Sequence, residues 1–174
     1  MFVLEGARAS PLRHRHPIHR ARITPMEKAW LEPDEQDVWR GFLRMNAWIY
    51  DELEHDLRDR DGLSLIEYGI LAHLSEAPEQ RMRMRDLAET VIVSKSRLSH
   101  QIARLERDGH VRRENCEDDR RGLWAVLTDD GTAALHRAAP GHATRVRSLM
   151  FDRLTPEQVD QLREIVDTLG GARP

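Results

Sequence analysis

The stretch 84–131, MRDLAETVIVSKSRLSHQIARLERDGHVRRENCEDDRRGLWAVLTDDG, decides the fold of this chain. Its pattern predicts a short helix, a second helix that ends at a glycine, two strands around a charged turn, and the start of another helix. The two helices are expected over 85–91 and 95–108, the second ending at Gly109. The strands are expected over 110–113 and 123–127, and the last helix starts at Thr128. This order of elements is that of a winged helix-turn-helix, which places one helix in a DNA groove and a β-ribbon on the neighbouring backbone or minor groove.

The second helix, 95–108, has two different faces. Leu98, Ile102 and Leu105 repeat at spacings of four and three, which predicts a buried stripe. The opposite face carries small hydroxyls, Arg and His, which suit a groove because hydroxyls bond phosphates or bases and Arg forks onto guanine. The candidate DNA contacts from this helix and its cap are Ser94, Lys95, Ser96, Arg97, Ser99, His100, Arg104 and Arg107. A solvated helix face is the alternative interpretation.

The charged turn EDDRRG, 117–122, is the candidate wing tip. Asp119 and Arg121 are two residues apart, so an extended strand places them on the same side. The aspartate would then hold the guanidinium in a bidentate pair for insertion into a narrow minor groove. Asp119, Arg120 and Arg121 are therefore further candidate DNA contacts, with an ordinary charged hairpin as the alternative.

These pieces together resemble the MarR family of bacterial transcriptional regulators between residues 63 and 131, and more loosely between 34 and 169. The likeness rests on Leu87-Ala88, 94–99, Ile102, Leu105-Glu106, Gly109, 111–113, 119–122 and 127–131. The resemblance implies a homodimer whose terminal helices interlock, with Asp119 and Arg121 matching the wing motif. It also implies an effector, a small aromatic or phenolic compound that binds between the dimerisation helices and the DNA-binding lobe. The turn at Cys116-Glu117-Asp118 departs from the proline-containing turn of many members.

Charge is unevenly distributed along the chain. The net charge is −3, yet residues 81–113 carry nine Lys/Arg against four Asp/Glu, while residues 29–80 carry four against thirteen. Local charge rather than net charge governs contact with phosphates, so this balance is compatible with a DNA-binding protein.

The composition and motifs indicate a cytoplasmic protein that neither spans a membrane nor acts as an enzyme. No apolar run approaches the roughly 20 residues of a membrane span, and none resembles a secretory signal. The lone Cys116 has no second thiol in the chain, which favours a plain wing residue over a redox switch. We find no phosphate loop, nucleophile elbow or Cys/His metal set, so neither an enzyme nor a cofactor is expected.

Apolar periodicity also predicts helices on both sides of the winged region. A long helix from about Asp34 carries two apolar strips, wider than one core contact needs, and this width suggests a partner subunit. The first strip is Val38, Phe42, Met45, Ile49, Leu53 and Leu57, and the second is Trp39, Leu43, Ala47 and Tyr50. Ser64 and Glu67 form a capping box for the next helix, and 155–158 opens the last one. Pro140-Gly141 is expected to kink or break the helix after Thr128, with helix resuming over 145–154.

The fold class is therefore mostly α with a small β-wing: a winged helix-turn-helix lobe plus N- and C-terminal dimerisation helices. The expected divisions are a disordered basic tail (1–28), an N-terminal dimerisation helix (29–62), the DNA-binding domain (63–128) and C-terminal dimerisation helices (129–174). The tail contains His14, His16 and His19, for which a DNA-touching basic arm is favoured over a metal site.

Aromatic side chains and one histidine are the candidates for effector binding. The candidate residues are Trp39, Trp48, Tyr50, Tyr68 and His73, and core or dimer packing is the favoured alternative for the aromatic side chains. The expected function is a homodimeric repressor that a small molecule releases from a pseudo-palindromic operator in double-stranded DNA. The alternatives are a winged helix that binds protein and a non-specific architectural DNA-binding protein.

Overall fold

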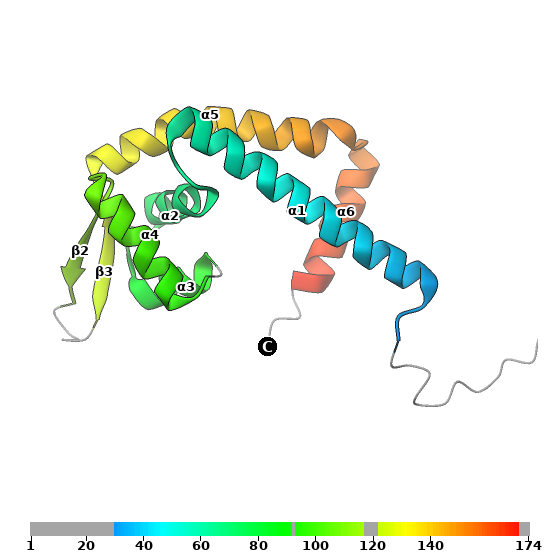
Figure 1. Cartoon of the computed structure of the whole chain (residues 1–174), viewed down its shortest axis with the longest axis horizontal. Helices are drawn as coiled ribbons and strands as arrows, with labels where there is room; N and C mark the ends of the chain where they lie inside the picture. Colours follow the sequence, from blue (N-terminus) through cyan, green and yellow to red (C-terminus); the bar gives the residue numbers. More distant parts are fainter. Residues whose placement is uncertain (1–29, 92, 117–121, 171–174) are drawn as a thin grey trace, which may run out of the picture. The chain divides into compact units, whose positions relative to one another are not determined.

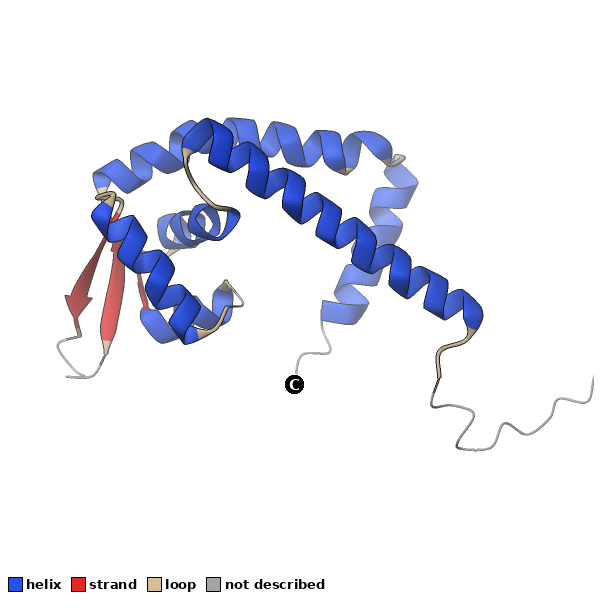
Figure 2. Ribbon diagram, viewed as in Figure 1, coloured by secondary structure: helices blue, strands red, loops and turns tan. Residues whose placement is uncertain are grey.

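The computed structural model describes residues 30–91, 93–116 and 122–170 (Figures 1 and 2). By its contacts the chain forms two units, 1–41 and 42–174, and α1 runs across their boundary. The helices are α1 (Pro33–Asp61), α2 (Leu65–Glu76), α3 (Met84–Thr90), α4 (Lys95–Arg107), α5 (Asp129–Leu149) and α6 (Pro156–Gly170). The strands are β1 (Arg81–Arg83), β2 (Val111–Asn115) and β3 (Leu123–Leu127), and the short turns η2 (Pro78–Gln80) and η3 (Phe151–Arg153) are 3₁₀ helices. The expected fold class, mostly helical with a small β-wing, is confirmed.

Helix α1 begins at Pro33, close to the expected start, and has the wide apolar surface that its sequence predicts. Leu53 and Leu57, near its C-terminal end, are buried. Earlier in the same helix Phe42, Leu43 and Met45 each remain about 45% exposed. Within the second unit, therefore, the core uses only the last turns of this helix and leaves an apolar surface beyond them.

Helix α2 is the central element of the core. Ser64 caps it through the predicted box, in which Ser64 Oγ accepts from Glu67 N at 3.2 Å and Glu67 Oε2 accepts from Ser64 N at 2.8 Å. Ile70, Leu71 and Leu74 are completely buried. The helix packs against α3, α4, α5 and the sheet, so a single core holds the helix-turn-helix and the wing together.

Three antiparallel strands form the sheet, in the order β1-β3-β2. The alternation of Arg and Met over 81–85 predicts a short half-buried strand. Arg81–Arg83 is such a strand and pairs with β3, whereas Met84 already begins α3. Strand β2 pairs with β3 from Val111↔Leu127 to Asn115↔Leu123. The two strands are thus the predicted wing hairpin.

Helix α5 corrects one expectation, because Pro140 and Gly141 do not break it. Pro140 is exposed, so water can bond the carbonyl that loses its amide partner one turn earlier. Gly141 has a packing role: a Cβ there would overlap the Arg60 guanidinium of α1. The resumed helix expected over 145–154 is also wrong at its end, since α5 stops at Leu149 and a 3₁₀ turn precedes α6.

The ends of the elements follow the predicted local signals. Gly109 adopts φ +78° after α4, and His110 N donates to Leu105 O at 2.8 Å, as in a glycine-terminated helix. Thr128 caps α5 by accepting from Gly131 N at 3.0 Å. Thr155 and Gln158 form the expected reciprocal box at the start of α6.

Candidate nucleic-acid interface

Helix α4 is fixed to the body of the lobe by its apolar face and its cap. Leu98, Ile102 and Leu105 are at most 1% exposed, as the helical periodicity predicts. Ser94 Oγ accepts from Arg97 N at 3.3 Å and lies 3.2 Å from Ser96 Oγ. The cap satisfies one amide at the N-terminus of α4, and the remaining amides there favour a negatively charged ligand such as phosphate.

The opposite face of α4 is open to solvent and polar. The structure brings together there seven of the eight residues proposed from the helix and its cap, all of them exposed: Ser94, Lys95, Ser96, Arg97, Ser99, His100 and Arg107. Ala103 is exposed among them and leaves room for close approach. This surface offers hydroxyls and cations; the acidic side chains near it are Glu106, which pairs with Arg113, and Asp108, just beyond the helix. Their individual roles in binding stay predictions.

Arg104 is placed differently from the other candidates. Its Nε lies 3.2 Å from Glu67 Oε1, and its Nη2 donates to Gly62 O at 3.0 Å. Two-thirds of its side chain is buried. The helical wheel put Arg104 at the flank of the outer face, but its long side chain turns inward to a carboxylate on α2. We therefore remove Arg104 from the candidate DNA contacts.

The wing joins α4 through Arg113 on β2. Arg113 Nη2 donates to Ser99 O at 3.3 Å and lies 3.2 Å from Glu106 Oε2, while Arg113 N donates to Glu106 Oε1 at 3.1 Å. These contacts hold the hairpin and the candidate recognition helix in a fixed relation.

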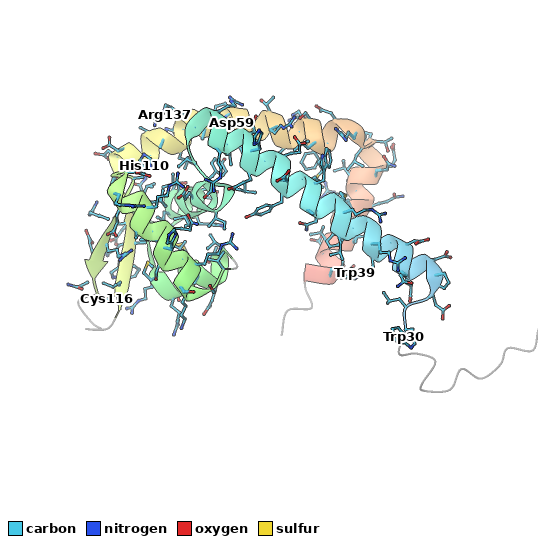
Figure 3. The ribbon with its side chains drawn as sticks, viewed as in Figure 1. Trp30, Trp39, Asp59, His110, Cys116 and Arg137 are labelled. Atoms are coloured by element: carbon cyan, nitrogen blue, oxygen red, sulfur yellow. The ribbon has the colours of Figure 1, made fainter. Side chains whose placement is uncertain are left out.

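The base of the wing is closed by Cys116 N, which donates to Gly122 O at 3.0 Å. Cys116 lies at the end of β2 and is only 4% exposed, so the thiol is shielded from solvent (Figure 3). The proposed contacts Asp119, Arg120 and Arg121 lie outside the described residues.

A groove of about 560 Å³ lies between the start of the helix-turn-helix and the wing base. Arg83, Arg85 and Lys95 line it together with Ser99 and Leu123. Sequence reasoning missed Arg83 and Arg85 as candidate contacts, although the Arg-Met alternation over 81–85 contains both of them. Arg83 and Arg85 lie outside α4 and extend the cationic surface beyond Lys95 and the helix itself.

The outer face of the sheet carries an aromatic side chain between two cations. The guanidiniums of Arg81 and Arg83 lie 5.0 and 5.1 Å from the ring centroid of Trp124. Arg81 also pairs with Glu79 at 2.5 Å. These contacts order the flank of the wing on the side of β1.

The candidate effector residues do not converge on one site. Tyr50 lines a crevice of about 910 Å³ formed by α1, α2 and the α3–α4 region, together with polar side chains such as Asn46, Arg97 and Gln101. Tyr68 instead lies against His142, and burial raises the pKa of its phenol. His73 lines a separate groove beside Trp124.

The two tryptophan candidates also lie elsewhere. Trp48 lies under the Arg153 guanidinium, with 4.8 Å to the ring centroid. Trp39 belongs to the first unit and is half-exposed (Figure 3). Of the five candidates, only Tyr50 lines the crevice of about 910 Å³.

Two negative findings apply to the described residues alone. Across residues 30–91, 93–116 and 122–170, no three His, Cys, Asp or Glu side chains are grouped so that they could hold a metal ion. Over the same ranges, no helix combines the length and apolar character needed to cross a membrane. His14, His16 and His19 lie outside this part of the chain.

Sequence comparison with known proteins finds transcriptional regulators. A MarR family model matches residues 61–122. The HTH-type transcriptional repressor YetL of Bacillus subtilis is 30% identical over 117 residues, which are 67% of this chain and 69% of that protein. The HTH-type transcriptional regulator PecS of Dickeya dadantii is 30% identical over 128 residues, 72% of this chain and 76% of PecS.

Solved structures similar to this chain are also MarR family transcriptional regulators. Sco3205, a MarR family transcriptional regulator from Streptomyces coelicolor in complex with DNA, is 45% identical with a TM-score of 0.79, over 83% of this chain and 92% of that one. AbsC, another MarR family regulator from that organism, is 46% identical with a TM-score of 0.76, over 82% and 95%. All of these relatives are transcriptional regulators, not enzymes.

Proposed function

Because this chain belongs to the MarR family of transcriptional regulators, we propose that it is a homodimeric repressor that binds a pseudo-palindromic operator. The observation that carries the proposal is the outer face of α4, where seven polar or basic side chains gather around Ala103 and remain exposed. The similarity to Sco3205, whose structure includes DNA, supports the same use of this surface.

The proposed contacts divide by chemistry. Ser96 and His100 lie on the centre of the outer face, where short side chains reach base edges and determine sequence preference. Ser94, Lys95, Arg97, Ser99 and Arg107 are the proposed phosphate and flanking contacts of the same helix. Asp119, Arg120 and Arg121 are proposed as the wing contacts. Arg104 is left out because it is engaged inside the lobe.

Dimerisation is proposed from the apolar surfaces that the second unit leaves uncovered. Phe42, Leu43 and Met45 on α1 and Val166 and Leu169 on α6 are all at least 45% exposed. Uncovered apolar side chains in such number mark an interaction surface. A two-fold axis through helices 29–62 and 129–174 would place two α4 helices about one DNA turn apart, which requires a pseudo-palindromic site.

We place the effector, a small aromatic or phenolic compound, in the crevice lined by Tyr50. Binding there would lower operator affinity only if the compound binds more tightly to the form with the wrong spacing of the two recognition helices. A preference of about 2–3 kcal/mol would weaken operator binding by roughly 30- to 150-fold.

A mobility-shift series on an operator and its base variants tests the proposal. We expect Ser96→Ala and His100→Ala to change the ranking of operator variants, and Arg107→Ala to weaken all of them together. Arg121→Ala should weaken binding while the protein stays dimeric. Unchanged binding by Arg121→Ala would exclude the wing contact, and binding that does not depend on salt would favour a protein-interaction module.

A further inference from the structure

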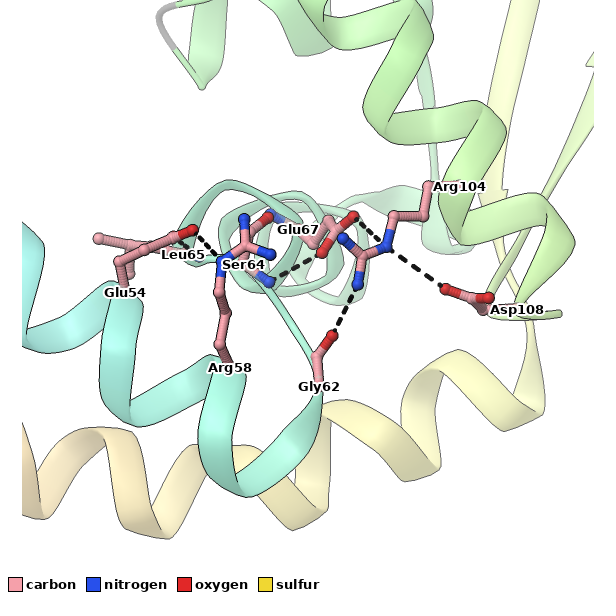
Figure 4. A network of polar contacts seen from close by, with 8 residues as sticks. All are labelled: Glu54, Arg58, Gly62, Ser64, Leu65, Glu67, Arg104 and Asp108. Atoms are coloured by element: carbon pink, nitrogen blue, oxygen red, sulfur yellow. Dashed lines mark hydrogen bonds and ion pairs between the residues drawn. The ribbon is translucent and has the colours of Figure 1, made fainter.

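A buried carboxylate links the recognition helix to the α1–α2 junction. Glu67 is 1% exposed, and Figure 4 shows it beside the Arg104 guanidinium. Its Oε2 is satisfied by Ser64 N of the capping box. Its Oε1 has no aligned hydrogen bond and faces Arg104 Nε at 3.2 Å. Arg104 therefore supplies the positive charge opposite a carboxylate that water does not reach.

The same guanidinium reaches the chain segment between the two helices. Arg104 Nη2 donates to Gly62 O at 3.0 Å, directly after the end of α1. On the other side of this junction, Glu54 of α1 accepts from Leu65 N at 2.6 Å and from Arg58 Nε at 2.6 Å. A continuous polar path thus joins α1, the start of α2 and the third turn of α4 (Figure 4).

Arg104 is committed to this path through both Nε and Nη2, and two-thirds of its side chain is buried. Turning it toward DNA would leave Glu67 as a buried charge without its partner, which is strongly unfavourable. Asp108, on the next turn, lies 3.8 Å from Arg104 Nε and adds a second carboxylate that retains the side chain. Arg107, in contrast, lies three residues further along the helix and is exposed.

We propose that Arg104 is a positioning residue for DNA recognition: through Glu67 and Gly62 it sets the orientation of α4 against the α1–α2 junction, and it neutralises no phosphate. This inference rests on the proposed DNA-binding function. Loss of the Arg104 side chain would let α4 shift relative to the body of the lobe. The exposed side chains on the outer face would then meet the DNA groove in a poorer geometry.

The salt dependence of operator binding separates the two roles. A plot of log binding constant against log salt concentration has a negative slope, and each phosphate contact that is lost reduces the magnitude of this slope by about 0.9. We expect Arg104→Met to weaken operator binding between about 2- and 30-fold while that slope stays at the wild-type value. Arg107→Met is the matched control on the same helix, for which we expect a reduced slope. A slope reduced by about 0.9 in Arg104→Met would overturn the proposal.

A double-mutant cycle tests whether Arg104 acts through Glu67. Glu67→Gln keeps a capping-box side chain but removes the charge, so the double variant leaves no buried carboxylate unpaired. We expect Arg104→Met to weaken binding less in the Glu67→Gln background than in wild type. Equal losses in both backgrounds would contradict the link.

Amide hydrogen exchange in α4 gives a readout that needs no DNA. We expect faster exchange along α4 in Arg104→Met than in Arg107→Met, at a temperature where both remain folded by circular dichroism. Equal exchange would overturn the positioning role even if the protein bound no operator. Faster exchange without operator binding would instead leave the link standing and count against the proposed function.

Discussion

The imidazole of His142 on α5 lies against the phenol ring of Tyr68 on α2, with ring centroids 4.3 Å apart and planes tilted by 39°. Burial lowers the pKa of His142, and the negative charge of Asp56 on α1 only partly opposes this effect. Its Nδ1 is buried without a hydrogen-bond partner among the described residues. The junction of these helices therefore favours the neutral imidazole.

This relationship predicts a loss of stability in mild acid. The pKa of His142 is lower in the folded protein than the unfolded value of about 6.5, so the unfolded chain binds the proton more readily. The stability that His142 contributes is present above about pH 6.5 and is lost as pH falls toward the folded pKa. We expect His142→Gln to reduce the fall in melting temperature between pH 8 and pH 5. The control is His136→Gln, an exposed histidine on the same helix; an equal reduction in both variants would contradict the assignment.

Two glycines of α5 should respond oppositely to the same substitution. A Cβ at Gly131 would overlap the backbone carbonyl of His110, which the hairpin and the α5 cap hold in place. We expect Gly131→Ala to reduce the free energy of unfolding by about 1–3 kcal/mol or more. A Cβ at Gly141 would meet only the end of the Arg60 side chain. Among the described residues, Arg60 is held only by a partly exposed 3.4 Å contact with Asp56, so its flexible end can shift. Because Ala is also a better helix former by about 1 kcal/mol, Gly141→Ala should be close to neutral. Chemical denaturation measures both, and similar losses at the two positions would be inconsistent with this packing.

Ser94 has a structural role that is separable from DNA binding. Its hydroxyl caps α4, so Ser94→Ala should reduce the free energy of unfolding by about 1 kcal/mol. Ser96→Ala, two residues later, removes a hydroxyl that makes no cap and should change stability by less than about 0.5 kcal/mol. Denaturation midpoints of the two variants, without DNA, provide the comparison. A larger loss in Ser96→Ala would reverse the assignment of the cap.

Local signals predicted most of the fold because they act over three or four residues. The capping box at Ser64, the glycine stop at Gly109 and the apolar stripe of α4 each depend on near neighbours, and each is confirmed. Pro140-Gly141 is also a local signal, but α5 continues through both residues because Pro140 is exposed and water can bond the carbonyl that loses its amide partner.

The contacts of the candidate site were less predictable where a long side chain reaches a residue that is distant in sequence. A helical wheel gives the angle of Arg104 on α4, yet it cannot show that Glu67 lies buried within reach from a different helix. Likewise, closeness in sequence suggested that Tyr50 and Tyr68 shared a pocket, whereas one lines the crevice and the other packs on His142. Arg83 and Arg85 became candidates only when folding placed them beside Lys95.

A footprint on the DNA upstream of the protein's own gene, with unrelated DNA as competitor at two salt concentrations, tests the central claim most directly. We predict a salt-sensitive complex that protects two half-sites with centres about 10 base pairs apart, or a multiple of one helical turn. Competition by unrelated DNA as effective as competition by the operator itself, with no protected half-sites, would contradict sequence-specific recognition by a dimer.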